Sequence, residues 1–331
     1  MSDALARPRI DWIPLALIAG IALAVMPLVG SVPTWVTLTV AGLAMGMMIF
    51  IMASGLTLVF GLMDVMNFAH GALISVGAYA AASVLIAMKP AIQSGDVLAN
   101  LSAIAPAVLA AMLLAGGLGL FFERVVIRPV YGDHLKQILV TMGGLIVCEQ
   151  LIHVVWGPDL IPLPKPGSFS GAVLLGDAAI ERYRMLAVAV GLAVFAAMWL
   201  VLNRTRLGLL IRAGVENPEM VESLGYRIRR LFVGVFVAGS ALAGLGGVMW
   251  AMYQESVNAQ MGMQMMVVIF IVIIIGGLGS VGGCFAGALL VGLVANYTGY
   301  VAPKLALGSN ILLMVLVLLW RPRGLYPVGN K

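Results

Sequence analysis

The sequence predicts an all-α, polytopic membrane protein with about ten transmembrane or half-spanning helices. Hydrophobic residues make up 62% of the 331 residues, whereas a soluble domain contains about 45–50%. Charged residues make up only 10%, too few to cover the surface of a soluble fold. The apolar runs are continuous rather than alternating, which excludes a β-barrel. The composition also excludes a soluble enzyme, a nucleic-acid-binding protein and a disordered chain.

The expected spans each contain about 20 mostly apolar residues. The first apolar run, 13–29, includes a small-residue pattern like that of a signal-peptide cleavage site. The run continues past that pattern and more spans follow, so we expect an uncleaved first helix. The remaining spans are expected at 35–63, 68–88, 101–122, 137–156, 185–202, 231–252, two short spans within 265–300, and 305–320.

The distribution of Lys and Arg predicts the orientation. If the N-terminus is cytoplasmic and the spans alternate, 14 of the 19 Lys and Arg residues lie on the cytoplasmic side, as the positive-inside rule requires. Residues 1–12 and 321–331 are therefore expected to be cytoplasmic tails of a single transmembrane domain, 13–320. Within this domain, 203–230 is expected to be a cytoplasmic loop. The proline-rich segment 157–184 is expected to be an ordered, extended external loop.

Polar residues interrupt the apolar sequence after the second span. Asp64, Asn67 and His70 are spaced by three, so they would share one face of a helix. Ionisable groups at membrane depth normally face a partner or a water-filled path. The segment could therefore be a broken helix at a translocation pathway, with Gly71 and Gly77 allowing close helix approach. The alternative is an interfacial turn whose polar side chains are simply wetted.

The most charged stretch, 203–230, carries the signals of a short helix. Asn217 suits the N-cap, Pro218 the first helical position, and Gly225 the C-cap. Such a helix would dock a soluble partner, whereas a solvated loop that only fixes topology would not need it. The residues predicted to take part in docking are Arg212, Glu216, Asn217, Pro218, Glu219, Glu222 and Gly225.

A glycine run divides the apolar sequence at 276–283. Glycine pairs can break a helix and let backbones touch, and the C-terminal charges favour two passes here rather than one. Residues 68–77 also resemble 285–292 weakly. This likeness could reflect a pair of broken segments in the two halves of a transporter, or it could be a chance match. The predicted break residues are Gly276, Gly277, Gly279, Gly282 and Gly283.

Together these segments resemble the permeases of bacterial branched-chain amino acid ABC importers, in particular the H-type membrane subunit. The resemblance extends from about residue 35 to residue 327. One departure is Ala72, where many H-type members carry an acidic residue. The residues that carry the match are the SGLTLVFG run of 54–61, the NFAHG block of 67–71, Gly77-Ala-Tyr79, Arg212-Ala213, Glu216, Leu224-Gly225, the stretch 239–253 and the glycine run 276–283.

The resemblance implies a transport subunit of the bacterial inner membrane, surrounded by lipid, that is not an enzyme and binds no metal, cofactor or nucleic acid. Its partners would be a second homologous permease, two cytoplasmic ATPase subunits that hold ATP and Mg, and a periplasmic binding protein. In agreement, the sequence has no G-x-x-x-x-G-K-[ST] phosphate loop. The ATPases would dock at the predicted helix in 203–230, and Asp64, Asn67, His70, Gly71 and Gly77 would line or gate the pathway.

Two alternatives remain open at this stage. The substrate could be urea, a short amide or another small acid instead of a branched-chain amino acid, because related permeases handle these compounds. The chain could also be an ion-coupled secondary transporter, which should carry several ionisable residues within its spans. The candidates for such residues are Asp64, Glu149 and His153.

Overall fold

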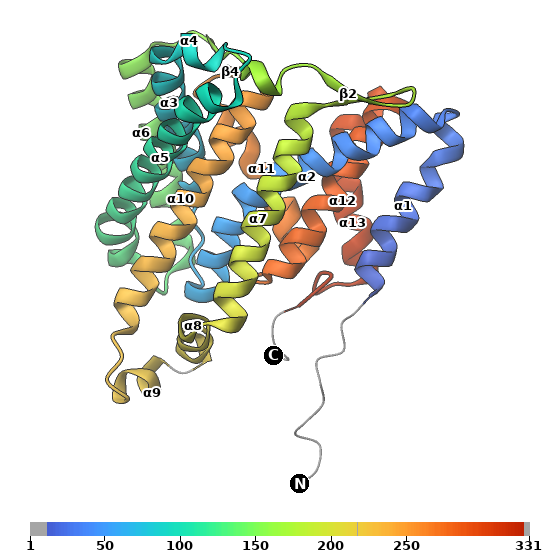
Figure 1. The fold of residues 1–331 in the computed structure, drawn as a ribbon. Coiled ribbons are helices and arrows are strands. Elements are labelled where there is room, and N and C mark those ends of the chain that lie inside the picture. The colour runs from blue at the N-terminus through green and yellow to red at the C-terminus, as the bar shows by residue number, and fades with distance from the viewer. Residues whose placement is uncertain (1–11, 217, 328–331) are drawn as a thin grey trace.

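The computed structural model describes residues 12–216 and 218–327, and this part of the chain forms a bundle of helices (Figure 1). A π-helical turn, Phe122–Ile127, follows one of them. The described α-helices are α1 Ile13–Val29, α2 Val32–Met63, α3 His70–Ala87, α4 Lys89–Ile92, α5 Val97–Phe121, α6 His134–Trp156, α7 Arg182–Arg204, α8 Arg206–Glu216, α9 Pro218–Ser223, α10 Ile228–Gln254, α11 Met261–Gly276, α12 Val281–Val301 and α13 Ala306–Trp320. The described strands are β1 Ile161–Pro162, β2 Ala172–Leu175, β3 Ala178–Glu181 and β4 Ser256–Val257.

The predicted all-α membrane fold is confirmed. Seven of the described helices are long and apolar enough to cross a membrane, and three shorter apolar helices accompany them. One of the shorter helices is α11, whose 16 residues extend about 24 Å, less than the ~30 Å of a hydrocarbon core. The prediction of about ten transmembrane or half-spanning helices is therefore confirmed, both in the number of apolar helices and in the presence of one too short to span.

Helix starts follow local capping chemistry. Pro33 occupies the first turn of α2, where its missing N–H costs nothing, and the helix therefore begins at Val32, three residues before the expected start. Asp96 and Asp133 accept backbone N–H hydrogen bonds at the starts of α5 and α6, as N-cap residues do. The sequence patterns did not indicate α4 or α8, because α4 directly follows a span and α8 lies within a segment expected to be mostly loop.

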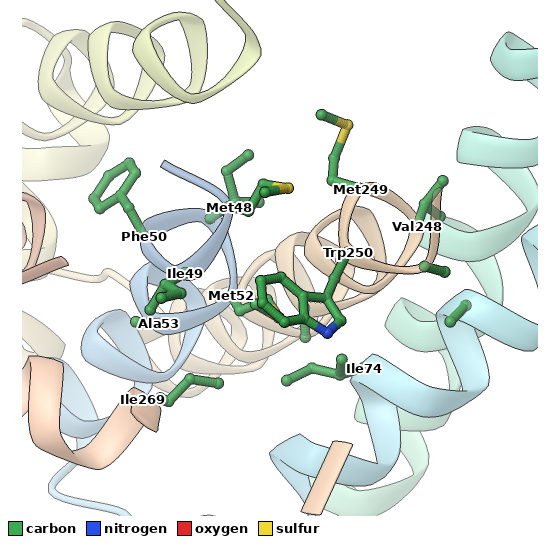
Figure 2. Packing of buried hydrophobic residues seen from close by; sticks show 14 of the residues in the cluster. Met48, Ile49, Phe50, Met52, Ala53, Ile74, Val248, Met249, Trp250 and Ile269 are labelled. Atoms are coloured by element: carbon green, nitrogen blue, oxygen red, sulfur yellow. The ribbon is translucent and has the colours of Figure 1, made fainter. Parts of the chain in front are cut away.

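The core of the bundle is formed where α2, α3 and α10 cross. Figure 2 shows the Trp250 ring of α10 near Met52 of α2 and Ile74 of α3, and all three side chains are buried. The helices approach closely because glycines face each other: a Cβ added to Gly239 would lie 2.6 Å from the carbonyl oxygen of Gly55. Helix association in lipid depends on such close packing, since lipid tails are as apolar as the side chains.

The segment 157–184 contains three short strands and a 3-10 turn. Strands β2 and β3 form an antiparallel hairpin, and β1 pairs with β4. Lys165 forms ion pairs with Glu181 and Glu255. Burial opposes the charged form of Lys165, but the hydrogen bonds to these two carboxylates outweigh it and raise the lysine pKa. The segment is therefore fixed to the bundle by a charged cluster.

The two ends of the bundle differ in what they carry. The start of α1, α8 and α9 lie at one end, whereas α4, β2 and β4 lie at the other (Figure 1). This arrangement is compatible with the predicted orientation, in which 157–184 is external and 203–230 is cytoplasmic.

Cysteine labelling tests that orientation. We expect Asp177→Cys, at the exposed tip of the β2–β3 hairpin, to react with a membrane-impermeant maleimide in intact cells. Ser223→Cys, at the end of α9, should react only after permeabilisation. The native residues Cys148 and Cys284 are buried, so background labelling should be low. The opposite labelling pattern would show that the orientation is inverted.

Candidate functional site

The first candidate site is a break between α2 and α3. Helix α2 ends at Met63, Asp64 adopts a left-handed conformation with φ 51°, and α3 begins only at His70. The expectation that Asp64, Asn67 and His70 share one helical face is therefore wrong. The Asp64 side chain is 74% exposed and lies 3.5 Å from His134, whereas Asn67 and His70 are each only 1% exposed.

The break penetrates the bundle. His70 Nε2 lies 2.9 Å from the carbonyl oxygen of Met52, and Met52 precedes the end of α2 by 11 residues, which is about 16 Å along the helix. Helix α3 thus begins well inside the bundle. The exposed Asp64 agrees with the alternative of a wetted interfacial turn. The buried Asn67 and His70 do not agree with it.

Two side chains of α6 satisfy the unpaired backbone of this break. Gln137 Oε1 accepts from the Met66 N–H at 3.2 Å, and Thr141 Oγ1 accepts from the Phe68 N–H at 3.1 Å. Both side chains are buried. Non-helical backbone at membrane depth is tolerated only where protein or water supplies such partners. Gln137 and Thr141 belong to the candidate site by these contacts, and sequence reasoning missed them because single polar residues in an apolar helix gave no sign of their distant partners.

A second break lies between α10 and α11 and has the same form. Glu255 ends α10 in a left-handed conformation with φ 55°, and α11 begins six residues later at Met261. Asp64 and Glu255 are the non-glycine residues with positive φ in the described chain. The N–H of Met261 donates to Asn258 O at 3.3 Å, as the N–H of His70 donates to Asn67 O at 3.3 Å. The two segments, DVMNFAHG of 64–71 and ESVNAQMG of 255–262, share an acid, an asparagine and a glycine at the same spacing.

The two breaks are related by an inverted arrangement. Along α2 and α10 the neighbours are Gly55 with Gly239 and Met52 with Gly246, so these helices run antiparallel. Helices α3 and α11 meet where Gly71 contacts Gly262. Inverted repeats with discontinuous helices are typical of membrane transporters, and their sites lie where the repeats meet.

Hydrogen bonds reinforce this contact. Ser75 Oγ of α3 accepts from the N–H of Gly262 and donates to the carbonyl oxygen of Ala259, both at 2.9 Å. Further along α3, Gly77 packs against Gly244 of α10. The starts of α3 and α11 are thereby held against each other and against α10.

An asparagine in each break retains unpaired polar atoms. Within the described residues, neither amide atom of the buried Asn67 side chain has a hydrogen-bond partner, and Asn258 Oδ1 has none either. Buried polar groups without partners are rare and costly. These three atoms are therefore available to a group that the isolated chain does not supply.

The glycine run forms a third break. Helix α11 ends at Gly276 and α12 begins at Val281; Gly277 and Gly279 have positive φ, whereas Gly282 and Gly283 belong to the first turn of α12. Gly279 packs against Gly61, close to the end of α2. The weak resemblance of 68–77 to 285–292 has no structural counterpart, because 285–292 lies within the continuous α12.

The predicted coupling segment contains two helices. Arg212 of α8 donates to the carbonyl oxygen of Leu202 at 3.1 Å and so ties α8 to the end of α7. Gly225 has φ 86°, and its N–H donates to Glu222 O at 2.9 Å after α9 ends. Asn217 and the side chains of Glu216 and Pro218 lie outside what the structure describes.

The surface formed by α9 and the turn after it is exposed and partly apolar. The side chains of Met220, Leu224 and Tyr226 are 52–68% exposed, and those of Glu219 and Glu222 are also exposed. Beside them is a surface hollow lined in part by Tyr226, Arg227, Arg229 and Arg230. An exposed apolar cluster rimmed by charges is typical of a docking surface.

Sequence reasoning also missed Glu123, a buried carboxylate in the π-helical turn after α5. Its Oε1 accepts from the Tyr131 hydroxyl at 3.2 Å. Burial and the neighbouring Glu123 carboxylate raise the pKa of Tyr131 above its ordinary value. In the described chain, no group of three or more His, Cys, Asp or Glu residues could hold a metal ion.

Comparisons place this architecture among known proteins. Residues 38–320 match the protein family described as the branched-chain amino acid transport system permease component. The chain is 27% identical over 292 residues to the high-affinity branched-chain amino acid transport system permease protein LivH of Escherichia coli strain K12, covering 86% of this chain and 92% of LivH. It is 30% identical over 297 residues to the corresponding permease protein BraD of Pseudomonas aeruginosa, covering 86% of this chain and 94% of BraD. It is also 24% identical over 322 residues to the probable permease protein LivM of Methanocaldococcus jannaschii, covering 84% and 90% of the two chains. No solved structure matches the chain.

Proposed function

The chain belongs to the permease component family of branched-chain amino acid transport systems, and from this premise we propose that it forms half of the membrane pathway for branched-chain or related small amino acids. It is a multi-pass membrane protein and a permease subunit of an ABC importer. The proposal places it in the bacterial inner membrane as a transport subunit without catalytic activity or a cofactor of its own.

The observation that carries the proposal is the pair of inverted helix breaks. Both introduce non-helical backbone and an incompletely paired asparagine into the membrane domain, at Asn67 and Asn258. A protein that only anchored other subunits would need neither break. Discontinuous helices at the meeting point of two repeats suit a pathway that opens and closes.

Within this proposal, Asn67, His70, Gly71 and Gly77 gate the pathway, and Asp64 lies at its exposed end. His70 holds the start of α3 against α2 through Met52, and Gly71 and Gly77 let the backbones approach. The glycine run 276–283 forms a turn against α2 at Gly61. These residues would move when the pathway changes state, while substrate passes between this chain and a second permease.

The partners of the importer are also proposed. Relatives include chains named LivM as well as chains named LivH, which supports pairing with a second, homologous permease. Two cytoplasmic ATPase subunits carrying ATP and Mg would dock on α9, and a periplasmic binding protein would deliver substrate to the side bearing 157–184. Docking of the ATPase subunits is supported by the exposed apolar and charged surface of α9 and of the turn that follows it.

Reconstitution of the importer tests the function. The chain is placed in proteoliposomes with its cognate permease, ATPase subunits and binding protein, and uptake of radiolabelled leucine is measured. We expect uptake that requires both ATP and this chain. Ion-driven uptake without the ATPase subunits would instead indicate a secondary transporter. ATP-dependent uptake of urea or a short amide, but not of leucine, would refute the amino acid substrate.

A substitution at Asn67 tests the gate. Because neither amide atom has a partner within the described residues, Asn67→Ala should leave the melting temperature nearly unchanged. Leucine uptake should nevertheless fall about tenfold, the effect of losing one hydrogen bond to a charged group. The comparison variant His70→Ala should lower stability by about 1 kcal/mol, because it removes the hydrogen bond to Met52. Normal uptake by Asn67→Ala would show that this residue is not part of the gate.

A further inference from the structure

Helix α6 carries a carboxylate well inside its membrane-spanning length. Glu149 follows the start of α6 by 15 residues and precedes its end at Trp156 by seven, distances of about 22 Å and 10 Å along the helix. The side chain is partly exposed. Within 12–216 and 218–327, no hydrogen bond or ion pair involves this carboxylate.

The position of α6 makes this carboxylate unusual. Helix α6 lies at the edge of the bundle (Figure 1) and packs mainly on α3 and on the turns after α5. Apolar neighbours such as Ile146, Leu151 and Val154 are 53–80% exposed, as lipid-facing or subunit-facing residues would be. An ionised Glu149 at this depth is costly in lipid and requires a polar partner or a water-filled path.

A polar strip connects Glu149 to the second break. His153 lies four residues further along α6, on the same face of the helix. Its Nε2 is 3.4 Å from Gln260 Nε2, directly before α11, while its Nδ1 is buried and unpartnered within the described residues. Asn258, whose Oδ1 is unpaired, lies in the same short segment before α11 as Gln260. The strip therefore runs from an unpaired carboxylate toward the site where the two repeats meet.

Resting on the proposed function, we infer that Glu149 binds the ammonium group of an amino acid during its passage along α6. A carboxylate forms charge-assisted hydrogen bonds with an ammonium group, which are about twice as strong as neutral ones. His153 and Gln260 are positioning residues that keep this face of α6 polar. The carboxylate would favour zwitterionic amino acids over urea and amides, which lack an ammonium group, and over simple acids, which carry only negative charge.

Removing the charge at Glu149 tests the inference in the reconstituted importer. Glu149→Gln keeps the size of the side chain but not its charge, so leucine uptake should fall about tenfold to a hundredfold. Complex assembly and leucine binding by the binding protein should not change, and Glu149→Asp should restore part of the uptake. The matched control is Gln150→Ala, an exposed neighbour on another side of α6, which should transport normally. Normal uptake by Glu149→Gln would overturn the inference, whereas absence of uptake by the unmodified importer would overturn the proposed function.

Thiol labelling at position 149 tests whether Glu149 lines a water-filled pathway or is covered by the second permease. Glu149→Cys is introduced into a variant in which Cys148 and Cys284 are replaced by alanine, and a water-soluble cationic thiol reagent is applied to the assembled importer. We expect reaction, and we expect leucine-loaded binding protein with ATP to slow it. No reaction in the importer, with reaction in the isolated chain, would show that the second permease covers Glu149. Reaction only with lipid-soluble reagents, or no effect of leucine, would equally overturn the inference.

Discussion

Replacing Gly262 by valine is expected to destroy the native packing of the membrane domain. A Cβ at this position would overlap the carbonyl oxygen of Gly71 and lie 2.7 Å from Ser75 Oγ. Neither neighbour can yield easily, because one is backbone and the other, Ser75 Oγ, is held by hydrogen bonds to Ala259 and Gly262. Overpacking at such a contact costs about 3 kcal/mol or more. We therefore expect no folded Gly262→Val protein by size-exclusion chromatography and no leucine uptake.

The control for this prediction is Gly117→Val in α5. Gly117 is exposed, and a Cβ there would meet no atom within 4 Å, so the same chemical change should leave elution and melting temperature nearly unaltered. Gly262→Ala should fall between the two, because it introduces the overlap without the branched side chain. Gly262→Val that melts and transports like the unmodified chain would contradict the close contact of α3 and α11.

Disruption of α9 is expected to abolish transport without loss of the protein from the membrane. Gly225 has φ 86° and donates its N–H to Glu222 O. Proline cannot adopt this φ and has no N–H to donate, so Gly225→Pro should displace the end of α9. Combined with Glu219→Arg, which reverses an exposed charge, it should reduce leucine uptake to background. ATP hydrolysis should no longer respond to substrate.

A second glycine provides the matched control for uncoupling. Gly132 also has positive φ, with no atom within 4 Å of an added Cβ, and lies in the turn before α6. If α9 docks the ATPases, Gly132→Pro should retain much more transport than the α9 variant at equal abundance in the membrane. An equal loss of transport in both variants would show that a proline at any such turn impairs transport. Normal transport by the α9 variant would refute docking of the ATPases at this helix.

The sequence predicts the spans well because hydropathy is a local property. The glycine turn at 276–283 is predictable for the same reason, since Gly277 and Gly279 alone supply the positive φ that the turn needs. The path of 64–70 is not predictable in this way. Residues 65–69 leave the helix because Gln137 and Thr141, some seventy residues away, satisfy their backbone, and tertiary partners of this kind leave no local signal.

The second break shows another limit. The segment 255–262 shares only an acid, an asparagine and a glycine with 64–71, too few identities to recognise before the two segments are seen to meet. Helix α8 was missed because its Leu and Arg residues suit either a loop that fixes topology or a helix on the membrane surface. For the second break, the deciding information lies in contacts between segments far apart along the chain.

The inverted repeat also bears on how the chain enters the membrane. A turn of similar form occurs at 64–71 and, in the opposite direction, at 255–262, so the form of the turn does not specify which end faces the cytoplasm. Direction must come from the flanking loops, above all from the arginines of 203–230. A half-length chain with one turn and evenly balanced loops would insert either way up. After duplication and fusion of such a chain, a few arginines would suffice to fix opposite orientations for its two copies.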